Sequence, residues 1–294
     1  MVSAFVIMFR EMLEMSMVLG VLFVVTRPVP SARRWIYIGA LIGLGGASFV
    51  AAFMHEMENS LQGAGEMVFN AVVMTVASVM IGWTVMWMSR HGRELNQRMQ
   101  KVGQAVSVGE LPQTALMMVS LAAVLREGSE AVFFMWGAAM AVPHDGLNMT
   151  IGGALGGLAA VALGYGMYKG LLRVPVGYIL RIAGWLLILL AAGMAGKAAG
   201  LFVDIGWLPG FMFPIWNTSH ILPADGTIGQ FLNVMIGYND APSTTQVAVF
   251  AASLITMIWL YRHYAKPVRA SDRQDEAQAQ QAHGQKSGEQ PQSS

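Results

Sequence analysis

The sequence contains no cysteine and few charged residues. Without cysteine, disulfide bonds, thiolate metal sites and a cysteine nucleophile are all excluded. Charged residues occupy 12% of the 294 positions, about half the share of a soluble globular protein, so they are too few to cover a soluble surface. The net charge of +1 excludes a nucleic-acid-binding protein that relies on bulk positive charge, and it also excludes an acidic disordered chain.

Hydrophobic residues are abundant, at 55% of the chain, and they fall in long runs. A transmembrane helix needs roughly 20 apolar residues to cross about 30 Å of hydrocarbon. Seven stretches have that length. We therefore predict an all-α integral membrane protein with seven transmembrane helices, near residues 3–25, 34–54, 67–88, 114–141, 150–172, 178–203 and 246–264.

Lys and Arg are missing from every second loop between these spans. Fifteen of the eighteen basic residues follow the first, third, fifth and seventh spans, and the loops after the second, fourth and sixth contain none. Basic loops remain on the cytoplasmic side of a membrane. This pattern predicts an outside N-terminus and a cytoplasmic C-terminus.

The segments between and after the spans differ in composition. We predict one membrane domain over residues 1–265, with a polar cytoplasmic connection at 89–113. The outer loop 204–245 is longer than a plain connector and rich in Trp and Pro, which predicts that it folds back onto the outer membrane face. Residues 266–294 are mainly polar, which predicts a disordered cytoplasmic tail.

Two of the predicted spans carry charges near their centres. The first contains Arg10, Glu11 and Glu14, and the fourth contains the same R-E-x-x-E pattern at positions 126–130. Six such groups facing lipid would cost on the order of 15–20 kcal/mol. The two motifs must therefore face each other, a partner helix or water.

The spacing within each motif predicts a cation site. Glutamates at i and i+3 share one helix face, and the arginine lies i,i+4 from the second glutamate. Together the motifs supply four carboxylates and two guanidinium groups, which leaves two formal negative charges uncompensated. Carboxylates without thiolates suit a hard cation such as Fe³⁺, Mn²⁺, Mg²⁺ or Ca²⁺, with which protons can compete. A structural Arg–Glu network that locks two helices together is the alternative.

The surroundings of the motif are repeated as well. The stretches VIMFREMLEMSMVLG and AAVLREGSEAVFFMWG begin 116 residues apart, with three predicted spans in each unit. Because three is odd, the second copy crosses the membrane in the opposite direction. This predicts an inverted repeat of three plus three helices, at about 1–88 and 114–203, followed by a seventh C-terminal helix. Transport sites in such repeats form near mid-membrane.

These motifs resemble those of the oxidase-dependent iron permease family, which includes fungal high-affinity iron permeases and bacterial EfeU-like permeases. The resemblance covers roughly residues 1–265 and rests on FVIMFREMLE, WTVMWMSR, LREGSEAVFF and GYNDAPS. It implies high-affinity uptake of iron across the cytoplasmic (inner) membrane. Iron, as Fe³⁺ or Fe²⁺, would be the transported substrate, and no cofactor would be permanently bound.

The resemblance also implies roles for individual residues and a partner. The four glutamates of the motifs (Glu11, Glu14, Glu127 and Glu130) would be metal ligands. Arg10 and Arg126 would tune the site, since arginine cannot ligate a cation. An extracytoplasmic protein that oxidises or delivers iron would be the partner, and the chain could form a homo-oligomer. No catalytic residue is expected, because this protein would not be an enzyme.

A second group of candidates lies in the outer loops. His55, Glu56, Glu58 and Glu66 could capture the ion at the entrance, or they could form a solvated acidic loop that helps set the topology. Fungal permeases carry an acidic motif with two carboxylates in the last outer loop. The matching segment here has one carboxylate, Asp240, which joins the candidates for outer capture.

Three other functions fit parts of the sequence. A proton-linked carrier of another divalent cation, such as Mn²⁺, would also use buried carboxylates. Copper transport would fit the twenty-three methionines, of which Met12, Met15 and Met17 lie beside the first motif. A membrane scaffold for an oxidase or electron-transfer complex would carry the same helices without transporting metal.

Overall fold

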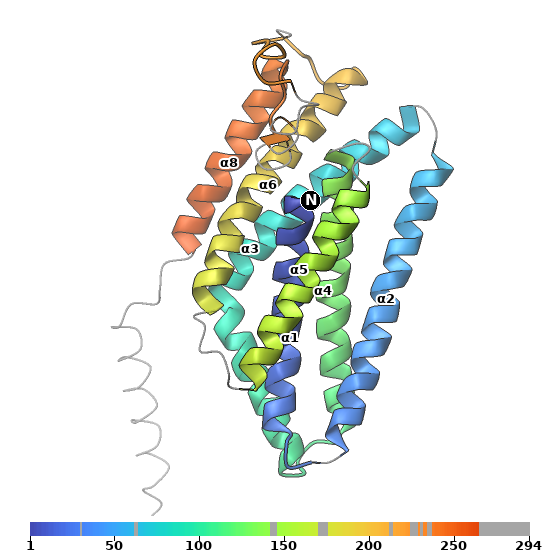
Figure 1. The fold of residues 1–294 in the computed structure, drawn as a ribbon, viewed down its shortest axis with the longest axis vertical. Helices are drawn as coiled ribbons and strands as arrows, with labels where there is room; N and C mark the ends of the chain where they lie inside the picture. The colour runs from blue at the N-terminus through green and yellow to red at the C-terminus, as the bar shows by residue number, and fades with distance from the viewer. Residues whose placement is uncertain are drawn as a thin grey trace, which may run out of the picture.

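The described part of the chain consists of helices joined by turns and loops, with no strand (Figure 1). The computed structural model describes residues 1–29, 31–61, 64–141, 146–169, 176–211, 214–223, 229, 232–233 and 237–264. The helices are α1 Val2–Val25, α2 Ala32–Ser60, α3 Ala64–Ser107, α4 Thr114–Ala141, α5 Gly146–Tyr168, α6 Val176–Asp204 and α8 Thr244–Tyr264.

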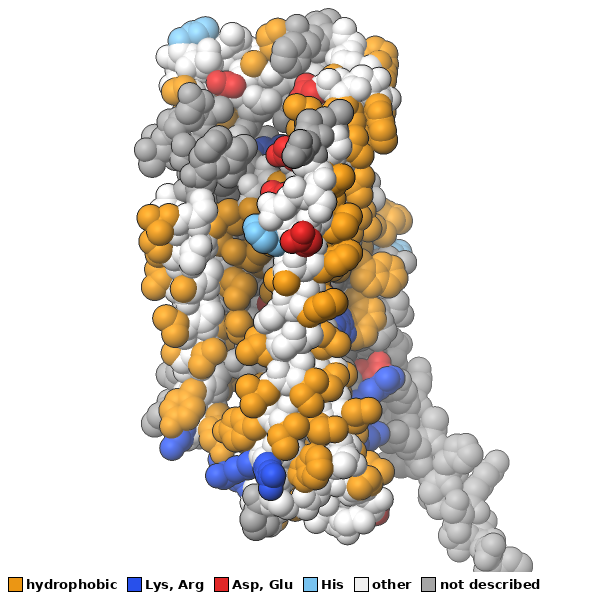
Figure 2. Space-filling model, turned by 90° about the vertical axis from the view of Figure 1, so that its right-hand side faces the viewer, with side chains coloured by type: hydrophobic (Ala, Val, Ile, Leu, Met, Phe, Trp, Pro, Cys, Tyr) orange, Lys and Arg blue, Asp and Glu red, His pale blue; other side chains and the backbone are white. Residues whose placement is uncertain are grey.

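The all-helical membrane character predicted from the sequence is confirmed. Five of the described helices contain a segment long and apolar enough to cross a membrane: α2, α3, α5, α6 and α8. Hydrophobic side chains cover much of the face seen in Figure 2, as expected of a surface that meets lipid. α1 and α4 also have the necessary length, but each carries three charged residues at its centre. The R-E-x-x-E motif is thus what separates these two helices from the other five.

The third helix is much longer than the predicted span. It continues through most of the connection predicted at 89–113 and ends at Ser107, after 44 residues. An exposed Arg98–Glu94 ion pair of 2.6 Å, one turn apart, supports the polar part of this extension. Val106 near its end packs against the buried Leu22 of α1 and Ile36 of α2. These apolar contacts anchor the extension beneath the bundle.

The other helix boundaries agree with the predicted spans to within four residues, except that α2 ends at Ser60, six residues beyond the predicted end at 54. α5 begins at Gly146 and ends at Tyr168, so the whole helix lies four residues earlier in the chain than the predicted span 150–172. The predicted tail at 266–294 lies outside the described residues.

Glycines allow the most extensive helix interfaces to form. α1 packs mainly against α5, and α2 mainly against α4. A Cβ atom at Gly152 or Gly156 of α5 would collide with the carbonyl oxygen of Met1 or Phe5. In α2, Gly39 is equally close to the carbonyl oxygen of Met117. The helix backbones approach so closely that only glycine fits at these positions.

We expect Gly43→Val to destabilise the fold and Gly45→Val, on the same helix, to be tolerated. A Cβ at Gly43 would lie 2.9 Å from both the Leu121 carbonyl oxygen and the Val124 Cβ, whereas Gly45 has nothing within 4 Å. Overpacking of this kind costs about 1–3 kcal/mol. The yield of monodisperse protein after heating in detergent measures the difference. Equal yields from the two variants would contradict the packing.

The long loop after α6 returns along that helix. Gly237 has a φ of +66°, and a Cβ there would lie 2.5 Å from the Cα of Gly193. Gly193 lies eleven residues before the end of α6, about 16 Å along its axis. The side chain of Lys197 donates a hydrogen bond to Asn233 of this loop. Part of the loop therefore lies well below the end of α6 rather than above it.

Candidate metal centre

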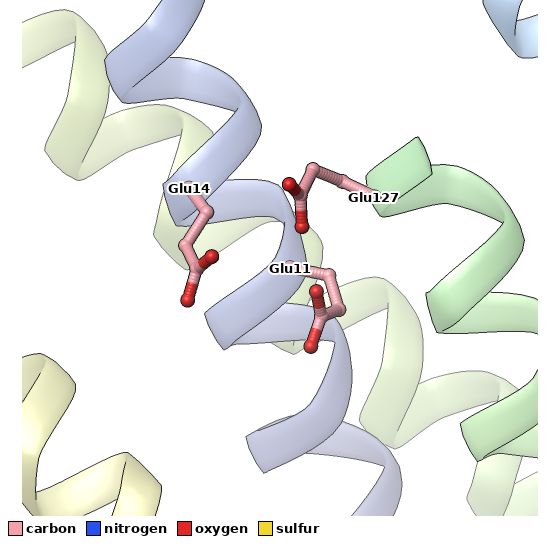
Figure 3. A group of neighbouring side chains, drawn as sticks. All are labelled: Glu11, Glu14 and Glu127. Carbon is pink, nitrogen blue, oxygen red and sulfur yellow. The ribbon is translucent and has the colours of Figure 1, made fainter. Parts of the chain in front are cut away.

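Three of the four motif glutamates come together between α1 and α4. The carboxylates of Glu11 and Glu14 from α1 and Glu127 from α4 each offer an oxygen, and these oxygens all lie within 4.8 Å of one another (Figure 3). The three residues are at most 4% exposed. Of the described residues, only these three bring potential ligand atoms of His, Asp or Glu so close together.

Arg10 balances part of this negative charge. Its guanidinium group lies 2.7 Å from Glu11 Oε1 and 2.9 Å from Glu14 Oε1, and it is as deeply buried as its partners. The Arg10–Glu14 ion pair follows from the spacing of the motif, because residues i and i+4 meet on one helix face, whereas Glu11 is the chain neighbour of Arg10. Arg10 therefore binds one oxygen of each carboxylate.

The second oxygen of each of the three glutamates has no partner. Glu11 Oε2, Glu14 Oε2 and Glu127 Oε2 are buried and accept no hydrogen bond. An unsatisfied buried acceptor costs about 1–3 kcal/mol, and more when the group is charged. The carboxylates that carry these oxygens each place one oxygen within 4.8 Å of the other two, a grouping suited to a bound hard cation.

Glu130 is held differently from the other three glutamates. Its Oε1 accepts a hydrogen bond of 3.0 Å from Arg126 Nε, and its Oε2 accepts one of 3.0 Å from the hydroxyl of Thr84 on α3. Glu130 is 8% exposed and lies outside the group of three. The sequence interpretation treats the four glutamates alike, whereas the structure distinguishes three of them from the fourth.

Arg126 is also less enclosed than Arg10. Its side chain is 36% exposed, lies 3.8 Å from Glu127 Oε1, and is stacked 4.4 Å from the ring centroid of Trp87. Thr84 and Trp87 are the two site residues that sequence reasoning did not identify. Both belong to the WTVMWMSR stretch, and the same span also contains Asn70, Thr75, Ser78 and Trp83, so residue type alone did not single them out.

Apolar side chains close both ends of the centre. Ile7, one turn before the first motif, and Phe134, one turn after Glu130, are fully buried in the same core cluster. On the other side, Leu22 is buried in the cluster that anchors the end of α3, together with Leu116. The centre is therefore enclosed in this conformation.

The residues predicted to capture the ion in the outer loops do not form a comparable group. His55, Glu56 and Glu58 lie in the last turns of α2 rather than in a loop, and Glu66 lies in the first turn of α3. His55 is exposed and hydrogen-bonds Asn59 at 3.1 Å. Glu56 and Glu66 are exposed and Glu58 is half-buried. None of these residues, nor Asp240, belongs to a cluster able to hold a metal among the described residues. Capture of the ion by the outer loops stays a prediction.

Taken with the helices around it, the centre defines a class of protein: an integral membrane protein with acidic groups buried between its helices. The chain belongs to the iron permease FTR1 family, whose model matches residues 1–265. It is thus a transporter rather than an enzyme, a multi-pass protein of the cytoplasmic membrane, and iron is its substrate.

Curated relatives extend over nearly the whole chain. The ferrous iron permeases EfeU of Shigella sonnei (strain Ss046) and of Escherichia coli O157:H7 are each 29% identical over 270 residues, or 90% of this chain and 96% of theirs. The ferrous iron permease EfeU of Escherichia coli O6:K15:H31 (strain 536) is 29% identical over 255 residues, or 85% of this chain and 91% of its own. No solved structure matches the chain.

Proposed function

We propose that the chain moves iron inward through the buried centre between α1 and α4. The observation that carries this proposal is the group of three buried carboxylates of Glu11, Glu14 and Glu127, each of which has one oxygen without a partner. In this view the three glutamates bind the ion directly. Glu130 completes the acidic centre as its fourth carboxylate, while Arg10 and Arg126 limit its negative charge.

The charge of the centre favours a divalent ion. Four carboxylates against two guanidinium groups leave two formal negative charges, which one Fe²⁺ would balance. The relatives are named ferrous iron permeases, which agrees with this charge count. Charges buried at low dielectric are tolerated when they are neutralised by partners.

A seven-span inverted repeat accounts for the way in which the helices pack. Gly39 and Gly43 of α2 approach the carbonyl oxygens of Met117 and Leu121, and Gly152 and Gly156 of α5 approach those of Met1 and Phe5. Met117 and Leu121 are each 116 residues after Met1 and Phe5, which is the spacing of the two motifs. The α2·α4 and α5·α1 contacts are thus counterparts in two repeats of three helices, with α8 as the added helix.

The charge distribution supports an orientation with the N-terminus outside. Lys and Arg gather at the lower end of the face in Figure 2, and most Asp and Glu side chains lie in its upper half. The basic end would face the cytoplasm. Iron would then arrive at the acidic side, delivered by an extracytoplasmic partner protein.

Transport requires the enclosed centre to open alternately to the two sides. The apolar cluster around Ile7 and Phe134 would separate toward the outside. The cluster of Leu22, Ile36 and Val106 would separate toward the cytoplasm. Movement of one repeat against the other accomplishes this in transporters built from inverted repeats.

Purified protein in liposomes tests the proposed function. We expect radiolabelled Fe²⁺ to accumulate in these vesicles and not in vesicles that contain Glu127→Gln, and we expect an imposed pH gradient to change the rate. Excess Mn²⁺ or Cu⁺ should compete less well than unlabelled Fe²⁺. Equal iron accumulation with both proteins would contradict the proposal, and stronger competition by Mn²⁺ or Cu⁺ would point to another cation.

A further inference from the structure

Thr84 of α3 contacts the second motif. Its hydroxyl donates a hydrogen bond of 3.0 Å to Glu130 Oε2, and the two side chains are 3% and 8% exposed. We propose that Thr84 is a positioning residue that holds Glu130 out of the metal's ligand set, so that the ion is bound by three glutamates instead of four. This inference rests on the proposed function.

The state of each carboxylate carries the inference. Thr84 donates to the oxygen of Glu130 that does not accept from Arg126, whereas Glu11, Glu14 and Glu127 each keep one oxygen without a partner. Arg126 holds the other oxygen of Glu130 at 3.0 Å. With a donor on each oxygen, Glu130 is fixed from two sides and stays outside the group of three.

The repeat explains why the two motifs differ. Glu14 is the counterpart of Glu130, since the two are 116 residues apart, and Arg10 binds it as Arg126 binds Glu130. Glu14 nevertheless keeps a free Oε2. The first motif therefore has the same internal ion pair but lacks the additional hydroxyl.

A stretch similar to the one that carries Thr84 occurs in α6, 102 residues further along the chain. The stretch Gly82-Trp83-Thr84-Val85 of α3 resembles Gly184-Trp185-Leu186-Leu187 of α6. The tryptophans of both stretches are exposed, and the last residue of each is buried. When the two stretches are aligned, Leu186 stands at the position of Thr84, and its side chain has no hydroxyl.

The two helices that carry these stretches pack on each other as counterparts should. Ser78 of α3 donates a hydrogen bond of 2.7 Å to the carbonyl oxygen of Ala191 in α6. A Cβ at Gly184 would lie 3.4 Å from the Val85 side chain. From Ser78 to Val85 the chain advances along α3, while the contacted residue of α6 moves back from Ala191 to Gly184. The two helices therefore run in opposite directions where they cross.

Holding one carboxylate away from the ion has a consequence for transport. Each further carboxylate ligand strengthens the binding of a hard cation. A centre with four free glutamates would bind iron more tightly and release it more slowly. Thr84 would thereby favour release of the ion over its retention.

Binding of Mn²⁺ to purified protein in detergent, followed by its electron paramagnetic resonance signal, tests the inference. We expect Thr84→Val, which removes the hydroxyl and keeps the shape, to lower the dissociation constant by roughly tenfold, the scale of one buried hydrogen bond. Thr84→Ala should act in the same way if the valine variant folds poorly. Thr84→Ser should restore the wild-type value, and Ser78→Ala is the matched control that removes a buried hydroxyl elsewhere on α3.

The effect should depend on Glu130. In a Glu130→Gln background, Thr84→Val should leave the dissociation constant unchanged, because residues that act through one another are not additive. The inference would be overturned if Thr84→Val lowered the Mn²⁺ dissociation constant equally in the Glu130→Gln background. It would also be overturned if Thr84→Val alone had the dissociation constant of the wild type. If Glu127→Gln binds Mn²⁺ as well as the wild type does, the metal centre itself is wrong and both proposals fail.

Discussion

Glu127→Gln should abolish iron uptake while leaving the protein folded. Glu127 contributes one of the three unpartnered oxygens, yet its nearest positive group, Arg126, lies at 3.8 Å, too far for a close ion pair. The substitution therefore removes a ligand without leaving a guanidinium group unpaired. Loss of groups that merely support a metal ligand lowers function by about 10–100-fold, so loss of the ligand should lower uptake by at least that much.

Uptake of radiolabelled iron at matched protein levels measures this effect, and the other glutamates provide the comparison. Glu11→Gln and Glu14→Gln should also abolish uptake, but each weakens the ion pair with Arg10, so their expression must be checked. Glu130→Gln should impair uptake while retaining metal binding, because the three ligands remain. Normal uptake by Glu127→Gln, Glu11→Gln and Glu14→Gln would refute the site.

Arg10→Gln should cause a large loss of stability, and Arg126→Gln a small one. Arg10 is 2% exposed and binds two carboxylates that are equally buried, so its removal leaves two charges without a partner. Breaking a buried ion pair from one side costs about 3–5 kcal/mol. Arg126 is more than a third exposed, and water can take over part of its role.

The yield of monodisperse protein after heating in detergent compares the two arginine variants. The double variant Arg10→Gln with Glu14→Gln should recover much of the lost stability, since one of the two unpaired charges is removed with the arginine. It should still fail to transport iron, because Glu14 is a ligand. If Arg10→Gln is as stable as Arg126→Gln, the buried charge network does not stabilise the bundle.

The sequence could predict the membrane helices because hydrophobic length is a local property. Its runs of about 20 apolar residues gave each described helix to within a few residues at most boundaries. The main exception was α3, whose polar extension to Ser107 has no apolar run to mark it. What holds the extension is contact between Val106 and residues far away in the chain, such as Leu22 and Ile36.

The candidate centre was only partly predictable for the same reason. The spacing of Arg10 and Glu14 on one helix turn determines their ion pair wherever the helix lies. The mid-span charges also required the motifs to avoid lipid. Neither fact specifies which carboxylate oxygens remain free, because that depends on donors from a third helix.

The sequence by itself determined the class of protein, the ends of most helices and the two motifs that face away from lipid. Only the tertiary structure decided that Glu11, Glu14 and Glu127 form one group while Glu130 is held by Thr84. The physical reason is the range of the forces involved. Hydrophobic length and i,i+4 pairing act within one helix, whereas a single buried hydroxyl on α3 reaches α4 only after the helices have packed.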